Sequence, residues 1–349
     1  MARLLVLGGS WFLGRTVVED ALARGWEVTT FRRGQTGQEV AGVTTIRGDR
    51  TNPDDLARLA ADGPWDAVVD TSSFVPRETL AMAKALEPVV GRYVLISTVS
   101  VYEGWPVEPL TEESRVLDCP SDAGPDFGFD GDPGPSVYGF TKAGCERAVT
   151  EVFGHDRTVL LRPGVILGPY EYVGRLPWWL HRVARGGRVL APGQPDRRIQ
   201  PVDVRDVSTF ALHAATADGP VGTFNVTASG RETMNDFLTA CQQATGSDAT
   251  FTWITDEEWL VAQGIAQWTE LPLWRTYRGA WAVDSAKARS AGLITRPLRD
   301  TATDTWTWLR SGGDAVAHER ASEQGIAPDK EHAILGTWDA RERDRCGSQ

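Results

Sequence analysis

The stretch that decides the fold is Leu4-Leu5-Val6-Leu7-Gly8-Gly9-Ser10-Trp11-Phe12-Leu13-Gly14. Its first four residues form an apolar run, which is typical of a parallel strand buried on both faces. Apolar residues at helical spacing follow over residues 15–24, and Gly25 is placed to end that helix. A strand, a glycine turn and a helix in this order favour a dinucleotide site, because backbone N–H groups of the turn can face a pyrophosphate.

One position of the turn departs from the simplest glycine pattern. The spacing is Gly8-x-x-Trp11-x-x-Gly14, with tryptophan in the middle. A bulky side chain there can push a bound nucleotide outward, or it can project into solvent or against a neighbouring lobe. We expect a dinucleotide site at this turn, and Trp11 is the residue that tests the expectation most directly.

Strand and helix patterns alternate through the first half of the chain. Strands are predicted at 27–31, 43–46, 65–70, 92–97 and 158–163, and helices at 53–61, 77–86 and 138–152. Asn52 and Pro53 stand where an N-cap and a first helical residue are expected. Repeated strand–helix units predict an α/β fold, a Rossmann-type doubly wound parallel sheet with right-handed crossovers.

The pattern changes after Gly168-Pro169. Helices are predicted at 178–185, 204–215 and 233–245, and short strands at 198–200 and 222–226. We therefore expect a dinucleotide-binding domain over 1–169, to which 204–226 returns. Residues 170–349 are expected to form a smaller C-terminal α/β substrate lobe. Its charged tail, 312–349, is predicted to be a loose helix or disordered.

Composition narrows the class of protein. The chain has 349 residues, of which 41% are hydrophobic, and its net charge of −11 argues against nucleic-acid binding. Its four cysteines show no metal-binding spacing, which predicts free thiols and a cytoplasmic protein without a metal. No apolar run approaches the ~20 residues of a membrane span, so no membrane partner is expected.

Two stretches carry residues suited to proton transfer. Thr98 follows the strand predicted at 92–97, and open α/β sheets bind ligands beyond the carboxyl ends of their strands. Tyr138 and Lys142 are four residues apart, so they share one face of a helix. An ammonium group near a phenol favours the phenolate and makes the tyrosine a better acid–base group near neutral pH. Tyrosine and lysine at this spacing are common by chance, and their meaning depends on the glycine turn.

With these motifs in order, the chain resembles the extended and atypical short-chain dehydrogenases/reductases of the NAD-dependent epimerase/dehydratase superfamily. The resemblance covers about residues 3–230. It rests on Gly-Gly-x-x-Phe-Leu-Gly-Arg over 8–15, on the Tyr–Lys helix, on the Asp70-Thr71-Ser72 strand end, and on the Arg-Pro-Gly…Gly-Pro run over 162–169.

The resemblance implies Tyr138 as the acid/base, Lys142 as its partner and Thr98 as the hydroxyl that orients the substrate oxygen. It implies contact of Asp49 with adenine and of the 163–165 backbone with the nicotinamide amide, and it makes a homodimer possible. The residues expected at the cofactor are Gly8, Gly9, Ser10, Trp11, Phe12, Leu13, Gly14, Arg32, Arg33, Asp49, Arg50, Thr71, Ser72, Lys142, Pro163 and Val165.

The end of the second strand bears on the choice of cofactor. Where the family can carry an acidic residue for the ribose 2′-hydroxyl, this chain has Arg32-Arg33. Arginines can pair with a 2′-phosphate or stack on adenine, which favours NADP over NAD. The alternative is that both arginines are solvated loop charges.

Two further departures narrow the reaction. Sugar-nucleotide dehydratases of the family carry Asp-Glu where this chain has Val99-Ser100, which disfavours dehydration. Epimerases usually carry an asparagine at the position of Val165, for the substrate diphosphate. The expected function is hydride transfer between nicotinamide and a secondary alcohol or ketone of a small molecule. A sugar or nucleotide-sugar epimerase with tightly bound NAD is one alternative, and a non-catalytic nucleotide-binding sensor is another.

Substrate contacts are the least defined part of the prediction. The candidates are Ser100, Tyr102, Tyr170 and Arg198, which follow strand ends or the Gly-Pro pair or lie in the expected lobe. Packing is the competing interpretation for Tyr102 and Tyr170, and ordinary surface charge is the competing one for Arg198. The loop over 118–137 is longer than a simple connection needs, and we expect it to act as a specificity lid.

Overall fold

The computed structural model describes residues 2–35, 37, 39–313 and 319–347, which form two compact units. The first unit comprises Met1–Ile166, Gln200–Ser229 and Tyr277–Thr295, and the second comprises Leu167–Ile199, Gly230–Thr276 and Arg296–Gln349. The predicted return segment 204–226 lies within the first unit. Residues 277–295 also lie there, although the sequence had assigned them to the lobe.

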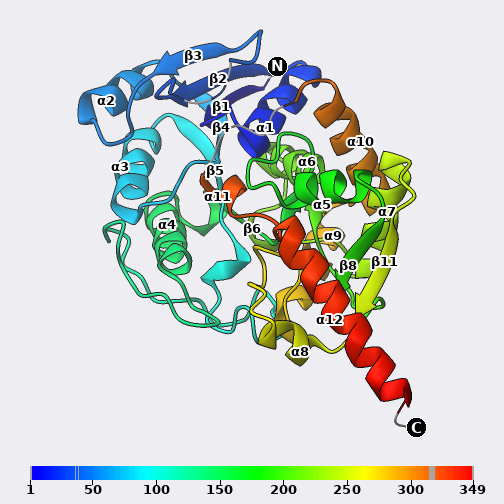
Figure 1. The fold of residues 1–349 in the computed structure, drawn as a ribbon. Coiled ribbons are helices and arrows are strands. Elements are labelled where there is room, and N and C mark those ends of the chain that lie inside the picture. The colour runs from blue at the N-terminus through cyan, green and yellow to red at the C-terminus, as the bar shows by residue number, and fades with distance from the viewer. Residues whose placement is uncertain (1, 36, 38, 314–318, 348–349) are drawn as a thin grey trace. The chain divides into compact units, whose positions relative to one another are not determined.

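A seven-stranded parallel sheet forms the centre of the first unit (Figure 1). Its strands are β1 (Arg3–Leu7), β2 (Glu27–Arg32), β3 (Thr44–Arg47), β4 (Trp65–Asp70), β5 (Val90–Ile96), β6 (Thr158–Pro163) and β10 (Gly222–Val226). They lie in the order β10-β6-β5-β4-β1-β2-β3, and every neighbouring pair is parallel. The strand order reverses at β1, which places the expected nucleotide site beside the end of this strand. The Rossmann-type fold is confirmed.

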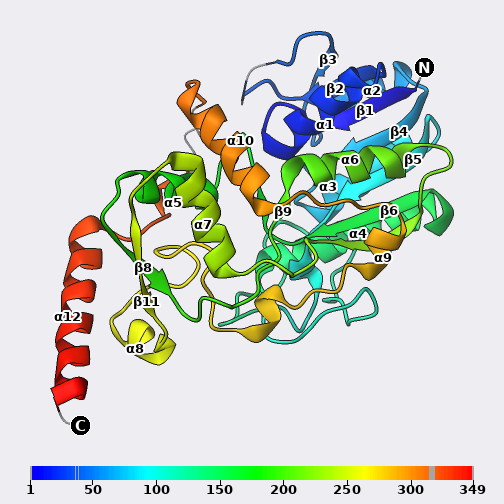
Figure 2. The same cartoon turned by 90° about the vertical axis from the view of Figure 1, so that its right-hand side faces the viewer.

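Helices cover both faces of this sheet. They are α1 (Phe12–Ala23), α2 (Pro53–Ala61), α3 (Pro76–Leu86), α4 (Val137–Phe153), α6 (Val204–Ala215) and α9 (Ala286–Ser290), with 3₁₀ turns η1 (Val99–Val101), η2 (His155–Arg157) and η3 (Arg278–Trp281). Helix α3 packs beside α4 and α1 beside α6. Figure 2 shows α4 and α6 on opposite sides of the strands.

Local sequence signals explain several boundaries in the first unit. The Asn52 side chain accepts a hydrogen bond of 3.0 Å from the Asp54 N–H and caps α2, as predicted. Gly25 follows the end of α1 with φ of 74°, a left-handed conformation that glycine adopts without strain. Leu5 and Val6 of β1 are fully buried, as is expected of a strand that has helices on both faces.

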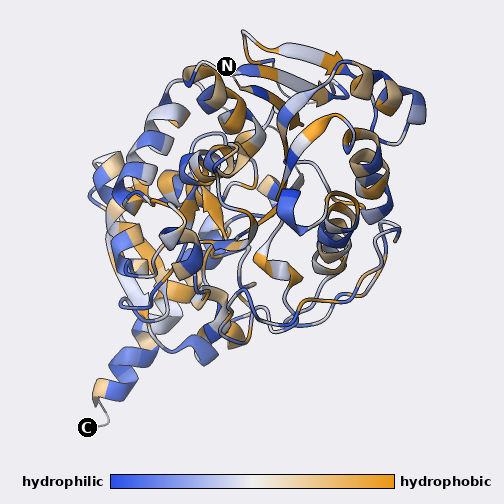
Figure 3. Ribbon diagram, turned by 180° about the vertical axis from the view of Figure 1, so that it is seen from behind, coloured by the Kyte–Doolittle hydropathy of each residue, from blue (hydrophilic) through white to orange (hydrophobic). Residues whose placement is uncertain are grey.

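The second unit is built on a short parallel pair of strands, β8 (Arg188–Pro192) and β11 (Thr250–Ile254). Its helices are α5 (Arg175–Ala184), α7 (Met234–Thr245), α8 (Glu257–Ala262), α10 (Leu298–Arg310), α11 (Glu319–Ser322) and α12 (Pro328–Gly347). Helix α7 packs against α5 and α10, and Thr233 with Asp236 forms a capping box at its start. Figure 3 shows that the last turns of α12 are mainly hydrophilic.

The structure differs from the sequence prediction in three places. The strand predicted at 198–200 is reduced to a bridge between Arg198 and Thr233, and a short strand β9 (Val202–Asp203) follows instead. Strands β8 and β11 and the short β7 (Ile166–Leu167) were not predicted. The tail, predicted as a loose helix or disordered, contains the 20-residue helix α12, which is anchored by the buried Glu331, while 314–318 and 348–349 lie outside the described residues.

Candidate active site

A cavity of about 320 Å³ lies beyond the carboxyl ends of β1, β2, β3 and β4. The residues that line it are Gly8, Ser10, Phe31, Arg32, Arg33, Gly34, Gln35, Gly48, Asp49, Arg50, Thr51, Ser72, Phe74 and Glu78. Seven of these were predicted at the cofactor from sequence: Gly8, Ser10, Arg32, Arg33, Asp49, Arg50 and Ser72. The cavity therefore lies where an open α/β sheet binds a nucleotide.

The glycines allow the turn to close tightly on the end of β4. Gly8 has φ of +105°, and a Cβ atom there would lie 2.8 Å from Thr71 Oγ1. A Cβ atom on Gly14 would lie 2.8 Å from the Gly9 backbone nitrogen. Thr71 cannot withdraw freely, because its hydroxyl donates a 3.0 Å hydrogen bond to the Leu7 carbonyl. The turn therefore leaves a hollow that any side chain on these glycines would fill. Such a hollow fits a pyrophosphate.

Trp11 occupies the middle of the turn without entering the cavity lining. It is the N-cap residue of α1, in an extended conformation with φ of −129°, and its side chain is half-buried. Phe12 and Leu13 are buried in the first turn of α1 and, like Gly9, Gly14 and Thr71, do not line the cavity. The tryptophan therefore leaves the cavity open at Gly8 and Ser10.

Arginines and carboxylates alternate around the far side of the cavity. Arg32 pairs with Glu39 at 2.6 Å, and Glu39 also contacts Arg47 at 3.3 Å. Arg33 is exposed and lines the cavity. Hydrogen bonds from the Thr51 N–H and hydroxyl lower the pKa of Asp49, so this carboxylate is held ionised at the edge of the cavity. Of the two predicted arginines, Arg33 is thus the one whose charge faces solvent.

Asp70 forms a buried polar cluster beneath the cavity, at the end of β4. Its carboxylate accepts hydrogen bonds from Arg50 at 2.9 Å, from the Tyr93 hydroxyl at 2.6 Å and from the Ser73 hydroxyl. Burial alone raises the pKa of a carboxyl group, but the Arg50 guanidinium and these donors hold the pKa of Asp70 below its ordinary value. Asp70 is fully buried, and its negative charge is stabilised by Arg50 and by the two hydroxyl donors.

The ammonium group of Lys142 lies beside this cluster, at the carboxyl ends of β4 and β5. Its ammonium nitrogen donates to the Ser73 carbonyl at 2.7 Å and to the Ile96 carbonyl at 2.6 Å. The residue is only 3% exposed, and burial lowers the pKa of Lys142. Tyr138 lies one turn earlier on α4 and is 44% exposed. The helix thus presents an accessible phenol one turn before a fixed, buried ammonium group.

Hydroxyl groups complete this edge of the sheet. Thr98 caps η1 by accepting a 3.1 Å hydrogen bond from the Ser100 N–H, and it is 8% exposed. Ser97 and Thr227 follow the carboxyl ends of β5 and β10, and both hydroxyls are buried without a hydrogen-bond partner among the described residues. Orphaned buried donors at a ligand-binding edge fit a bound polar group. The residues present therefore fit a dinucleotide from the glycine turn to the ends of β5 and β10.

Tyr102 does not belong to this edge, and its assignment to a substrate needs correction. The residue has no exposed surface, and its hydroxyl donates a 2.7 Å hydrogen bond to Asn225 Oδ1. Its ring lies 4.7 Å from the Arg162 guanidinium, which forms a buried ion pair with Glu146. Tyr102 is therefore a core residue that links α4, β6 and β10.

The remaining predicted residues divide between the two units. In the first, Pro163 ends β6, and the Val165 carbonyl accepts a 2.9 Å hydrogen bond from the Val202 N–H. In the second, the ring of Tyr170 lies 5.4 Å from that of Trp308, and Arg198 is exposed, with its guanidinium 3.5 Å from the Gly230 carbonyl. Contact of these residues with cofactor or substrate stays a prediction.

Several lining residues were missed at the sequence level. They are Phe31, Gly34, Gln35, Gly48, Thr51, Phe74 and Glu78. Phe74 is 52% exposed, and its ring centroid lies 5.6 Å from the Lys142 ammonium nitrogen. A phenylalanine in the polar loop directly after β4 was a usable signal, because loops at the carboxyl ends of strands in an open α/β sheet face the ligand.

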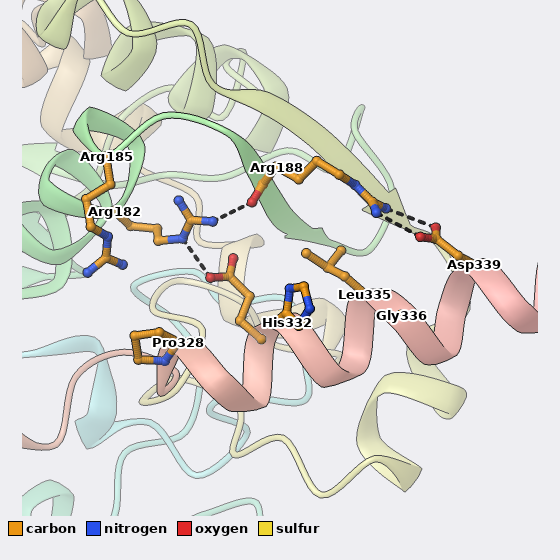
Figure 4. Close-up of a pocket in the computed structure, with 9 residues that line it drawn as sticks. Arg182, Arg185, Arg188, Pro328, His332, Leu335, Gly336 and Asp339 are labelled. Atoms are coloured by element: carbon orange, nitrogen blue, oxygen red, sulfur yellow. Dashed lines mark hydrogen bonds and ion pairs between the residues drawn. The ribbon is translucent and has the colours of Figure 1, made fainter.

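The second unit has a cavity of its own, of about 560 Å³, between α12 and the corner formed by α5 and β8 (Figure 4). Arg182 and Glu331 form a buried ion pair of 2.7 Å, and Glu331 also accepts the Leu190 N–H at 3.0 Å. Arg188 binds both carboxylate oxygens of Asp339, at 2.7 and 2.9 Å. These charges satisfy one another, so we interpret them as the attachment of α12 rather than as a ligand site.

Residues 2–35, 37, 39–313 and 319–347 contain no group of three or more metal-ligating side chains and no helix long and apolar enough to cross a membrane. The four cysteines are free thiols, and only Cys346 is exposed.

The fold and site define a class of protein. A doubly wound sheet with a glycine turn, a strand-end hydroxyl and a tyrosine–lysine helix is the arrangement expected of a short-chain dehydrogenase/reductase. Residues 4–227 match the model of the NAD dependent epimerase/dehydratase family, and the chain belongs to that family. The predicted enzyme class, a short-chain dehydrogenase/reductase type of oxidoreductase, is confirmed at this level.

Two curated proteins are similar in sequence. The chloroplast stem-loop binding protein of 41 kDa b from Arabidopsis thaliana is 24% identical over 260 residues, which are 70% of this chain and 63% of that protein. The 2-alkyl-3-oxoalkanoate reductase of Stenotrophomonas maltophilia is 28% identical over 237 residues, which are 62% of this chain and 67% of the reductase. The match to the plant protein thus spans less than two thirds of its length.

Solved structures resemble the chain over nearly its whole length. The Bordetella bronchiseptica enzyme WbmH, solved with NAD⁺, has a TM-score of 0.67 at 17% identity and covers 90% of this chain and 100% of its own. The UDP-glucose 4-epimerase of Thermotoga maritima, solved with UDP-glucose, has a TM-score of 0.67 at 18% identity and covers 89% and 100%. At these identities the likeness shows the fold.

Proposed function

We propose that this protein is an NAD(P)-dependent oxidoreductase that transfers hydride between nicotinamide and a secondary alcohol or ketone of a small molecule. The observation that supports it best is the fixed ammonium of Lys142, held by the carbonyls of Ser73, in the loop after β4, and of Ile96, at the end of β5, one helical turn from the accessible Tyr138. An immobile positive charge beside a phenol is what an acid–base tyrosine needs near neutral pH.

The roles of the chain's own residues follow from their positions. A bound nicotinamide supplies or accepts the hydride at the substrate carbon. Tyr138 donates or accepts the proton at the substrate oxygen, and Lys142 stabilises the phenolate. Thr98 orients the same oxygen: its hydroxyl accepts the Ser100 N–H and donates to Ser100 Oγ at 3.3 Å, and the substrate oxygen replaces Ser100 Oγ as the acceptor of this O–H. Ser100, Tyr170 and Arg198 remain the candidate substrate contacts.

The glycine turn and the arginines account for cofactor binding in this proposal. Gly8 and Ser10 lie at the pyrophosphate and Asp49 at the adenine, while the 163–165 backbone faces the amide. Arg33 selects NADP by pairing with the 2′-phosphate, because its charge is exposed in the cavity lining. Arg32 supports it from within its ion pair with Glu39.

Activity with purified protein tests the proposal. NADPH or NADH consumption is measured with a panel of ketones, including 3-oxo acids because of the name of the bacterial reductase. The Tyr138→Phe variant is expected to lose about 10²- to 10⁴-fold in kcat while it keeps its nucleotide affinity. A folded protein that binds no nicotinamide nucleotide, or a Tyr138→Phe variant with full activity, contradicts the proposal.

A second candidate uses the same residues for epimerisation. It is favoured by the likeness over the full length of the UDP-glucose 4-epimerase. An epimerase returns the hydride to the other face of its substrate, so it keeps NAD bound and shows no net consumption of NADPH. Release of stoichiometric NAD on denaturation of the purified protein would favour this candidate. A non-catalytic nucleotide sensor would bind nucleotide without turning over any substrate.

A further inference from the structure

The position of Lys142 depends on the loop after β4. Two of the three N–H groups of its ammonium are directed to the carbonyls of Ser73 and Ile96, at 2.7 and 2.6 Å. One N–H therefore remains for a ligand or for Tyr138. The Ile96 carbonyl belongs to a strand in the middle of the sheet, whereas the Ser73 carbonyl belongs to a loop and needs support from elsewhere.

That support comes from Asp70. The Ser73 hydroxyl donates to the Asp70 carboxylate, and both residues have no exposed surface. Tyr93, in the middle of β5, donates to the same carboxylate at 2.6 Å. Asp70 thus fixes the loop that carries the Ser73 carbonyl between two rigid strands.

The same carboxylate reaches the wall of the nucleotide cavity. Arg50 lines the cavity, donates to Asp70 at 2.9 Å and donates to the Ser72 carbonyl at 2.6 Å. Its side chain is 13% exposed. An unbroken chain of hydrogen bonds therefore runs from the cavity wall through Asp70 and Ser73 to the ammonium of Lys142.

We propose that Asp70 and Ser73 are positioning residues for Lys142, and that through Arg50 they join the ammonium to the wall of the nucleotide cavity. The assignment of a role in turnover rests on the proposed function, whereas the positioning itself is a property of the protein without ligand. The competing interpretation is that the cluster contributes to folding stability alone. The two interpretations differ in one outcome. Only positioning predicts that the Lys142 ammonium becomes less fixed in a variant that stays folded.

Nuclear magnetic resonance of the lysine side chains can decide between them. The sequence contains four lysines, Lys84, Lys142, Lys287 and Lys330, and only Lys142 is buried in the structure. In ¹³C,¹⁵N-lysine-labelled protein without nucleotide, the slowest-exchanging Nζ protons should belong to Lys142. They are assigned by their loss in Lys142→Arg.

The test variant is Ser73→Ala, which removes the hydroxyl and keeps the backbone carbonyl. Loss of the hydrogen bond to Asp70, together with the 3.4 Å hydrogen bond accepted from Arg50, should speed exchange of the Lys142 protons about tenfold. Ser208→Ala is the matched control, because Ser208 is also fully buried and also donates to an aspartate, Asp20, at 3.3 Å. It should leave Lys142 exchange unchanged. Tyr93→Phe removes another donor to Asp70 and should raise exchange about threefold.

Unchanged Lys142 exchange in folded Ser73→Ala or folded Tyr93→Phe overturns the proposal. In an active enzyme, the neutral variant Asp70→Asn should also shift the pH profile of kcat, since removal of this anion lowers the pKa of Lys142 further. Failure of the proposed function looks different: nucleotide titration then causes no change in any lysine signal, while Ser73→Ala still alters Lys142.

Discussion

Replacement of Gly8 by alanine tests the glycine turn most sharply. Gly8 has φ of +105°, where a side chain is strained, and the added Cβ would lie 2.8 Å from Thr71 Oγ1. The backbone strain costs about 1–3 kcal/mol, and insertion of a methyl group into a close-packed site costs about 1–3 kcal/mol more. We therefore expect Gly8→Ala to lower the free energy of unfolding by roughly 2–6 kcal/mol.

Two other glycines separate these contributions. Gly25 also has positive φ, at +74°, but nothing lies within 4 Å of an added Cβ, so Gly25→Ala should cost only about 1 kcal/mol. Gly14 lies in α1, where its φ is ordinary, and its added Cβ would lie 2.8 Å from the Gly9 nitrogen, so Gly14→Ala measures the clash less the roughly 0.5–1 kcal/mol by which a helix favours alanine over glycine. Urea denaturation followed by circular dichroism gives all three values.

Nucleotide affinity is the second readout for the same variants. The Thr71 hydroxyl is bound to the Leu7 carbonyl, so the clash in Gly8→Ala is relieved by movement of the turn and its N–H groups. We expect NADP⁺ to bind about tenfold more weakly to Gly8→Ala or worse, which corresponds to about 1.4 kcal/mol. Gly25→Ala should bind as the wild type does. A folded Gly8→Ala that binds with unchanged affinity refutes the placement of the pyrophosphate at this turn.

Three further predictions concern charged residues. Glu331→Gln breaks a buried ion pair and should lower the free energy of unfolding by about 3 kcal/mol or more, whereas Asp339→Asn, in an exposed pair, should cost at most about 1 kcal/mol in the same urea titration. Burial raises the pKa of Glu171 to about 7 from 4.5. The protonated carboxyl therefore adds about 3 kcal/mol to the free energy of unfolding below pH 4.5, and this contribution is lost as the pH rises to 7. Glu171→Gln should flatten the pH dependence of the free energy of unfolding. A variant whose stability falls with pH as steeply as that of the wild type contradicts the raised pKa of Glu171. Arg33→Ala should weaken NADPH binding about tenfold and leave NADH binding nearly unchanged, as measured by fluorescence titration; equal losses for both nucleotides would leave Arg33 without a role in selection.

Local patterns were sufficient for the parts of the fold that local physics controls. Buried parallel strands appear in the sequence as continuous apolar runs, and the strand predicted at 65–70 coincides with β4. Caps depend on neighbouring residues only, so Asn52 and Gly25 were predictable. A cavity at the glycine turn was predictable in the same way, from the strand, glycine and helix patterns that follow one another over residues 4–24.

Contacts between distant segments were not predictable in this way. Even over seven residues, the pairing of Arg32 with Glu39 could not be predicted, because Arg32 and Arg33 look equivalent in sequence. The burial of Tyr102 depends on Asn225, more than a hundred residues away. The network beneath the cavity is similar, because nothing in the local sequence connects Asp70 to Tyr93 or Ser73 to Lys142.

The interleaved path of the chain has a consequence for the order of folding during synthesis. The first unit takes its last segment from Tyr277–Thr295, after most of the second unit has been made. The second unit in turn needs Glu331, which accepts the Leu190 N–H from a strand synthesised 141 residues earlier. Domains usually fold as units, the N-terminal one first, as they leave the ribosome. Here neither unit can complete its hydrogen bonding until most of these 349 residues have emerged, so the synthesis of Tyr277–Thr295 and Glu331, rather than the emergence of the glycine turn, sets when a binding-competent protein exists.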